Sequence, residues 1–132
     1  MIFGKYCTCY TVGIISGRST AVNNIYQEAL DELVPGILKI IRSQAESIIL
    51  YGSVARGTEE SESDVDIAVL VQGPLTTESE EQLSSFIVDM NLKYDKVFSV
   101  IDIDVDIFRR WRDIIPFYRN VDDEGIVLWT AA

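Results

Sequence analysis

The stretch GSVARG at residues 52–57, followed by SDVD at residues 63–66, joins a turn of small residues to two carboxylates two positions apart. It lies between two apolar runs, Ser47–Tyr51 and Ile67–Val71, which the sequence predicts to be buried strands. Small residues let a backbone approach phosphate closely, and carboxylate oxygens are preferred ligands of Mg²⁺. Because side chains alternate along a strand, the two aspartates would point to one face. These parts predict a site for a nucleoside triphosphate and its metal ions.

A long helical pattern precedes this stretch. From Ser19 to Ile41, apolar residues recur every three or four positions, which predicts a helix with one buried face. Pro35 within it forfeits a backbone hydrogen bond, so we expect either a kink or two helices meeting end to end. Residues 1–18 lack the periodicity and are interpreted as a leader of uncertain structure, whereas residues 19–132 are interpreted as one domain.

Helix and strand patterns alternate after Val71. Thr77 and Glu80 fit a capping box for a second helix, which would end near residues 91–95. Residues 96–103 are rich in β-branched and aromatic side chains, which predicts a third strand. The remaining expected elements are a short helix over 106–113, a helical turn from Pro116 to a Gly125 cap, and a last strand over 126–129. This order predicts an α+β (mixed α/β) fold, with a small mixed sheet backed by helices.

The composition fits a globular protein and excludes several classes of function. Hydrophobic residues make up 48% of the 132 residues, but no apolar run approaches the roughly 18 residues that a membrane span needs. The net charge of −10 argues against a long nucleic-acid partner, because binding to phosphates relies on Lys and Arg. The absence of histidine excludes Ser–His–Asp and Cys–His catalysis. Cys7 and Cys9 are interpreted as free thiols of a cytoplasmic protein, since their spacing suits neither a zinc site nor a disulfide.

Nucleotidyl transfer assisted by metal ions needs clustered carboxylates and donors for the triphosphate. Asp64 and Asp66 form the expected pair, and the third carboxylate should come from the third strand, where Asp102 is favoured over Asp104. Arg56 could bind phosphate through charge-assisted hydrogen bonds, or it could hold the loop by pairing with the carboxylates at 59–62. The alternating aspartates of the third strand could instead serve only to keep an edge strand soluble.

The combination of GS-x-ARG and SD-x-D resembles the signature of the DNA polymerase β-like nucleotidyltransferase superfamily, and the short chain looks most similar to its minimal, MNT-like members. The resemblance covers about residues 25–129. It implies a nucleotidyltransferase fold, ATP or another nucleoside triphosphate as donor, and two Mg²⁺ ions. The implied nucleotide-binding residues are Gly52, Ser53, Arg56 and Ser63, and the implied catalytic and metal-binding residues are Asp64 and Asp66, with Asp102 as the expected third.

One position departs from the family pattern. Many members carry a third aspartate early in the third strand, where this chain has Phe98-Ser99-Val100-Ile101, so that Ser99 could stand in its place. Either Asp102 substitutes from a shifted register, or the third carboxylate is missing and catalysis is weak or absent.

Minimal members are often paired with a small all-helical HEPN protein, as the antitoxin of a toxin–antitoxin pair. The resemblance therefore implies transfer of AMP from ATP to a hydroxyl group of such a partner. Two alternatives stay open. The chain could be a non-catalytic module that neutralises its partner by binding, or a transferase for a small molecule such as an aminoglycoside, which would need a further acceptor-binding domain or a homo-oligomer.

Overall fold

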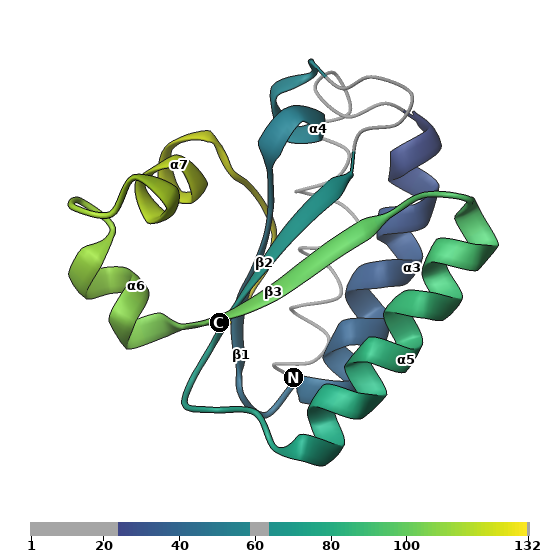
Figure 1. The fold of residues 1–132 in the computed structure, drawn as a ribbon, viewed down its shortest axis with the longest axis horizontal. Helices are drawn as coiled ribbons and strands as arrows, with labels where there is room; N and C mark the ends of the chain where they lie inside the picture. The colour runs from purple at the N-terminus through teal and green to yellow at the C-terminus, as the bar shows by residue number, and fades with distance from the viewer. Residues whose placement is uncertain (1–23, 59–63, 132) are drawn as a thin grey trace.

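Four strands form one mixed sheet at the centre of the molecule (Figure 1). The computed structural model describes residues 24–58 and 64–131, so the expected leader at 1–18 lies outside the described residues. The sheet order is β3-β2-β1-β4, with β2 and β3 parallel and the other neighbours antiparallel. This arrangement confirms the α+β class. The elements in chain order are α3 (Asn24–Ile41), β1 (Ala45–Tyr51), α4 (Gly52–Arg56), β2 (Val65–Val71), α5 (Thr77–Tyr94), β3 (Phe98–Asp104), α6 (Val105–Trp111), α7 (Pro116–Glu124) and β4 (Ile126–Thr130).

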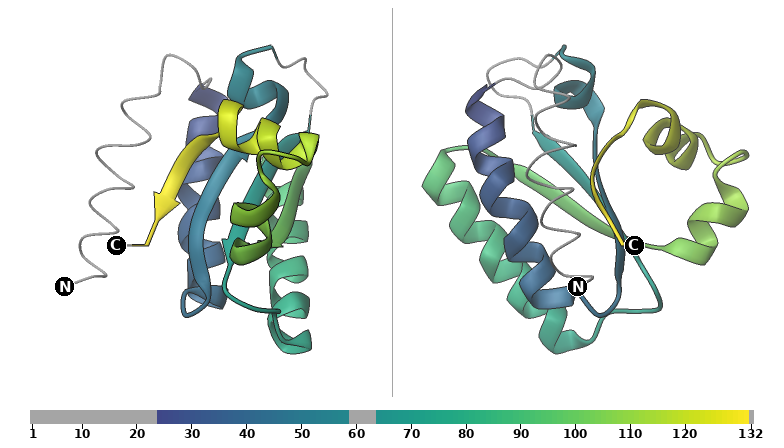
Figure 2. Two further views of the ribbon diagram at one scale, coloured as in Figure 1. Left: turned by 90° about the vertical axis from the view of Figure 1, so that its left-hand side faces the viewer. Right: turned by 180° about the vertical axis from the view of Figure 1, so that it is seen from behind.

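Helices cover both faces of this sheet. The long helices α3 and α5 lie against one face, and the short helices α6 and α7 lie against the other (Figures 1 and 2). Because side chains alternate along a strand, Ile48 packs in the core beneath α3 and α5, whereas Ile49 packs in a second core beneath α6 and α7. The first core is the larger and holds fully buried side chains such as Leu33 of α3 and Trp129 of β4. It therefore carries more of the hydrophobic stabilisation, which scales with buried apolar area.

The register of the strands aligns three side chains across the sheet. Asp66 of β2 pairs with Tyr51 of β1 on one side and with Ser99 of β3 on the other. Directly opposed residues point to the same face, and Tyr51 packs against the core beneath α6 and α7. These three residues therefore lie on that face, at the end of the sheet where β1 leads into α4.

A single helix, α3, continues through Pro35. Of the two outcomes expected at this residue, the division into two helices is therefore wrong. Proline costs the helix one backbone hydrogen bond, but Leu33 and Val34 before it, and Ile37 and Leu38 after it, are all buried. Packing of both halves on the sheet holds the helix together, since most helical stability in proteins comes from such packing.

The helix α5 is capped by a different residue from the one predicted. Its N-cap is Thr76, whose hydroxyl accepts a hydrogen bond from the Ser79 N–H at 3.1 Å, so the Thr77–Glu80 capping box is wrong. Adjacent threonines both suit this role, and the backbone places the first of them outside the helix. The predicted end of the helix is confirmed, because Asp95 adopts the left-handed conformation (φ 52°) just beyond Tyr94.

The predicted order of the C-terminal elements is confirmed, with small shifts at their ends. Pro116 opens α7, and Gly125 caps it by donating its N–H to the Val121 carbonyl at 3.0 Å. The N-cap of α6 is Asp104, whose carboxylate accepts hydrogen bonds from the N–H groups of Asp106 and Ile107 at 2.9 and 3.2 Å. Within the described ranges, no helix combines the length and apolarity needed to cross a membrane.

Candidate active site

The first five residues of the segment GSVARG, Gly52–Arg56, form a helix, α4, rather than the expected turn. Its first residue, Gly52, has φ +80°, a conformation that side-chain-bearing residues rarely adopt. A Cβ atom at this position would lie 2.4 Å from Oδ2 of Asp66. Glycine is thus required here twice, for the backbone angle and for the close approach of the Asp66 carboxylate to the backbone.

Asp66 is a partly buried carboxylate beside other charged groups. Burial raises the pKa of Asp66, the negative charge of Asp64 raises it further, and the Arg56 guanidinium lowers it in part. Asp64 is exposed and immediately precedes β2. The structure therefore brings the two predicted aspartates close enough to repel each other, at the point where β2 begins.

This pair of carboxylates fits a bound cation. Two negative groups that disfavour each other's ionisation are stabilised by a positive ion between them. Mg²⁺ commonly takes one or two carboxylates and fills its other positions with phosphate oxygens and water. Asp64 and Asp66 thus have the chemistry to hold a Mg²⁺ ion that also contacts a nucleotide. Among residues 24–58 and 64–131, however, no group of three or more acidic, cysteine or histidine residues is arranged to hold a metal ion.

Asp102 is not brought to the other two aspartates. In the parallel register, Asp66 pairs with Ser99, and Asp102 pairs with Val69, whose side chain packs in the core beneath α3 and α5. Asp102 therefore lies on the opposite face from Asp66, where it lines an open pocket of about 410 Å³ together with Glu80 and Ser84. The expectation that Asp102 joins this cluster is corrected by geometry, because a separation of three residues along a strand reverses the side-chain direction.

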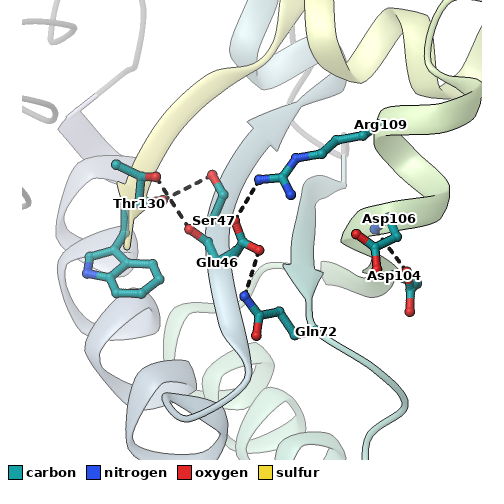
Figure 3. A network of polar contacts seen from close by, with 8 residues as sticks. Glu46, Ser47, Gln72, Asp104, Asp106, Arg109 and Thr130 are labelled. Carbon is teal, nitrogen blue, oxygen red and sulfur yellow. Dashed lines mark hydrogen bonds and ion pairs between the residues drawn. The ribbon is translucent and has the colours of Figure 1, made fainter. Parts of the chain in front are cut away.

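The alternative from the third strand, Asp104, is also engaged elsewhere. Its carboxylate caps α6, as Figure 3 shows from close by. The residue of β3 that stands beside Asp66 is Ser99, a side chain without charge. The described part of the site therefore presents two carboxylates, and the position next to them on β3 offers a hydroxyl group.

Arg56 points to a partner that the sequence did not indicate. Its guanidinium pairs with the Glu124 carboxylate of α7 at 3.0 Å, and both side chains are substantially exposed. The alternative partners at 59–62 lie outside the described residues, as does Ser63. Ser53 follows Gly52 in α4, and its carbonyl accepts a hydrogen bond from the Thr58 N–H at 3.0 Å. The ion pair thus ties α4 to α7 beside the aspartates.

Two aromatic residues of this neighbourhood were missed by reasoning from the sequence. Tyr51 lies next to Asp66 on β1, and Phe117 of α7 meets its ring edge to face, with centroids 5.6 Å apart. Burial raises the pKa of Tyr51, and the charge of Asp66 adds to this rise. For Tyr51, its position directly before Gly52 was a signal that it lies near the site. For Phe117 the sequence offers no such signal, because it is 66 positions from Tyr51 and the contact leaves no local pattern.

Comparison with known proteins places the chain within one family. The family model described as Polymerase beta, Nucleotidyltransferase matches residues 37–131. The chain is 33% identical over 106 residues to "Putative protein adenylyltransferase MJ0604" of Methanocaldococcus jannaschii. The aligned region covers 78% of this chain and 97% of that protein. It is also 34% identical over 74 residues to "Putative protein adenylyltransferase MJ0141" of the same organism. That aligned region covers 56% of this chain and 75% of that protein.

Two solved structures have a similar fold. One is the crystal structure of a toxin–antitoxin with AMP-PNP, with a TM-score of 0.52, 21% identity and coverage of 76% of this chain and 73% of that chain. The other is a mutant of the toxin–antitoxin MntA-HpeT, with a TM-score of 0.54, 20% identity and coverage of 77% and 73%. At these identities the similarity supports the fold.

Proposed function

Because the chain belongs to the Polymerase beta nucleotidyltransferase family, we propose that it transfers AMP from ATP to a hydroxyl group of a partner protein. The observation that carries this proposal is the contact between Gly52 and Asp66, with Asp64 alongside. It sets the Asp66 carboxylate against the start of α4, the segment that bears the nucleotide-binding signature, and Asp64 precedes Asp66 by two residues. The two relatives named as protein adenylyltransferases support AMP as the transferred group.

The roles of the residues follow from this arrangement. Asp64 and Asp66 would hold Mg²⁺, which neutralises charge on the phosphates when it is bound. Gly52 and Ser53 would offer backbone N–H groups to the triphosphate, the role that the resemblance of their motif to the family signature implies. The acceptor oxygen forms a bond to the α-phosphorus as the bond to pyrophosphate breaks. Pyrophosphate leaves, and the proton of the hydroxyl group passes to water.

We assign the chain, within the same proposal, the role of an antitoxin that modifies a small helical HEPN-type toxin. The resemblance of its motifs to minimal members supports this role, and both structures of similar fold are toxin–antitoxin complexes, one of them with an ATP analogue. The partner's modified group would be a hydroxyl group that reaches the two aspartates.

A second candidate function is neutralisation by binding alone. It is favoured by one observation, the presence of Ser99 beside Asp66 while Asp102 lies on the other face. With two carboxylates in place of three, the site would bind a nucleotide but transfer it slowly or not at all.

Transfer of label from α-labelled ATP tests the two candidates together. The chain is co-expressed with a HEPN-type protein and labelled in the presence of Mg²⁺. We expect label on the partner, and its loss in Asp64→Asn with Asp66→Asn. The matched control is Asp102→Asn, which removes a carboxylate from the opposite face and should leave transfer intact. Absence of transfer from the unmodified protein, together with neutralisation of a toxic partner by the double variant, would favour binding alone.

A further inference from the structure

Exposed apolar side chains gather on α6, α7 and the turn between them. The described part of the chain exposes eight large hydrophobic side chains, and five of them fall within residues 107–117. On α6, the exposed Ile107 and Trp111 are four residues apart and so share one face, while Phe108 is buried in the core. Concentrated apolar exposure of this kind marks interaction sites. We call the following five residues the α6–α7 patch: Ile107, Trp111, Ile114, Ile115 and Phe117.

The α6–α7 patch adjoins the candidate active site. Phe117 contacts the ring of Tyr51, and Tyr51 is the strand neighbour of Asp66. The helices α6 and α7 lie on the Asp66 side of the sheet, the face opposite to α3 and α5 (Figures 1 and 2). A molecule that covers the patch would therefore stand beside the aspartates.

The charge around the patch differs from that of the whole chain. Residues 105–119, which carry the patch, contain four arginines and two aspartates, and the acidic residues of α7, at 122–124, follow this stretch. Arg109 pairs with Glu46 at 2.7 Å, and Arg112 pairs with Asp122 at 3.7 Å. Arg110 makes no ion pair within residues 24–58 and 64–131. A complementary partner would have an apolar centre with carboxylates around it, since aromatic and arginine side chains are enriched at protein interfaces.

We infer that the α6–α7 patch is the docking surface for the acceptor protein, and that it holds the acceptor's hydroxyl group beside Asp66. This inference rests on the proposed transfer to a protein and adds the surface that selects that protein. The partner it fits is a protein with an apolar contact surface and acidic groups at its margin.

Paired substitutions on the two sides of the sheet test this surface. Trp111→Ser with Ile114→Ser removes apolar area from the patch, and the matched control, Val88→Ser with Leu92→Ser, removes exposed apolar area from α5. Arg110→Glu tests the charge, with Lys39→Glu of α3 as its control. Transfer of labelled AMP is measured against the concentration of the HEPN-type acceptor, and binding of Mg-ATP to the free protein is measured by calorimetry. Unfolding temperatures show whether each variant is folded. If the double apolar variant does not fold, Arg110→Glu still tests the surface, because it replaces an exposed side chain.

We expect both patch variants to raise the acceptor concentration at half-maximal transfer by on the order of tenfold or more, with unchanged ATP affinity and no effect of either control. Equal acceptor dependence in all variants would overturn the docking surface while leaving the proposed function in place. Light scattering tests whether the patch binds a second copy of the chain instead. If the unmodified protein is a dimer, and the patch variants are monomers with normal acceptor dependence, the docking inference is also overturned. If ATP binds but no acceptor is ever labelled, the proposed function fails and the docking inference fails with it.

Discussion

The two faces of the sheet are built from the same strands but differ in what they bury. Beneath α3 and α5, two 18-residue helices close a large apolar core. Beneath α6 and α7, helices of seven and nine residues close a smaller one, which ends at the row containing Asp66. A sheet can thus be stabilised from one side while the other side stays open enough for charged groups and partners. Because the alternation of a strand assigns neighbouring residues to different faces, neighbouring substitutions can test this division.

The largest expected effect is on stability, from two adjacent isoleucines of β1. Ile48 and Ile49 are both buried but face the larger and the smaller core. Ile48→Ala should lower the free energy of unfolding by about 4 kcal/mol, and Ile49→Ala by about 2 kcal/mol, because the smaller core beside the site loses fewer contacts. Denaturant unfolding measures both values. Equal losses would show that the two cores contribute equally.

The next effect is on activity, from the contact between Gly52 and Asp66. Gly52→Ala would displace the Asp66 carboxylate, and we expect transfer to fall on the order of a hundredfold, since small misplacements at a reacting centre have such costs. The control is Gly73→Ala, because Gly73 has a similar φ of +76° but nothing within 4 Å of an added Cβ. Loss of transfer in both variants would trace the effect to backbone strain in general.

Two acids on the same face should respond to pH in opposite directions. The pKa of Asp66 is raised in the folded state by burial, so its ionisation destabilises the protein as pH rises through that pKa. Asp66→Asn should therefore raise the unfolding temperature at pH 7 and have no effect below about pH 3, where Asp is protonated in both states. Thermal unfolding between pH 3 and pH 7, without Mg²⁺, measures this.

Glu46 supplies the contrast. A hydrogen bond from Gln72 at 2.8 Å and the bond from Arg109 at 2.7 Å hold the pKa of Glu46 below its usual range (Figure 3). It therefore stabilises the protein above the usual glutamate pKa of about 4.3, and this stabilisation is lost as pH falls. Glu46→Gln should lower the unfolding temperature at pH 7. A change of the same sign in Glu46→Gln and Asp66→Asn would contradict these assignments.

The smallest effect concerns the exposed ion pair between Arg56 and Glu124. A double-mutant cycle with Arg56→Ala and Glu124→Ala should give a coupling of about 0.5 kcal/mol at low salt, because exposed pairs are screened by solvent. The coupling should decrease at high ionic strength. A coupling that persists in concentrated salt would indicate that the pair is shielded from solvent.

Much of the fold could be predicted because its signals are local. Alternation and β-branched residues located the strands, and helical periodicity located α3 and α5. Of the two outcomes expected at Pro35, the division into two helices was wrong because burial on both sides outweighed one lost hydrogen bond. The helical form of α4 was missed because small residues and glycine also suit a turn.

The candidate site could be predicted only where its residues are close in the sequence. Asp64, Asp66 and Gly52 lie within one short stretch, and the structure brings them together. The side of the sheet on which Asp102 falls depends on the register of β2 with β3, and a change of one residue would reverse it. Such a register is set by the packing of whole strands, which no local pattern encodes.

The two tryptophans of this chain occupy the two faces whose difference matters most. Trp129 is fully buried in the core beneath α3 and α5, whereas Trp111 is 40% exposed in the α6–α7 patch. Intrinsic fluorescence therefore contains two separable signals, a blue-shifted emission protected from aqueous quenchers and a red-shifted emission open to them. Iodide quenching would follow coverage of the patch without any added label, and the protected component would report the integrity of the fold in the same spectrum.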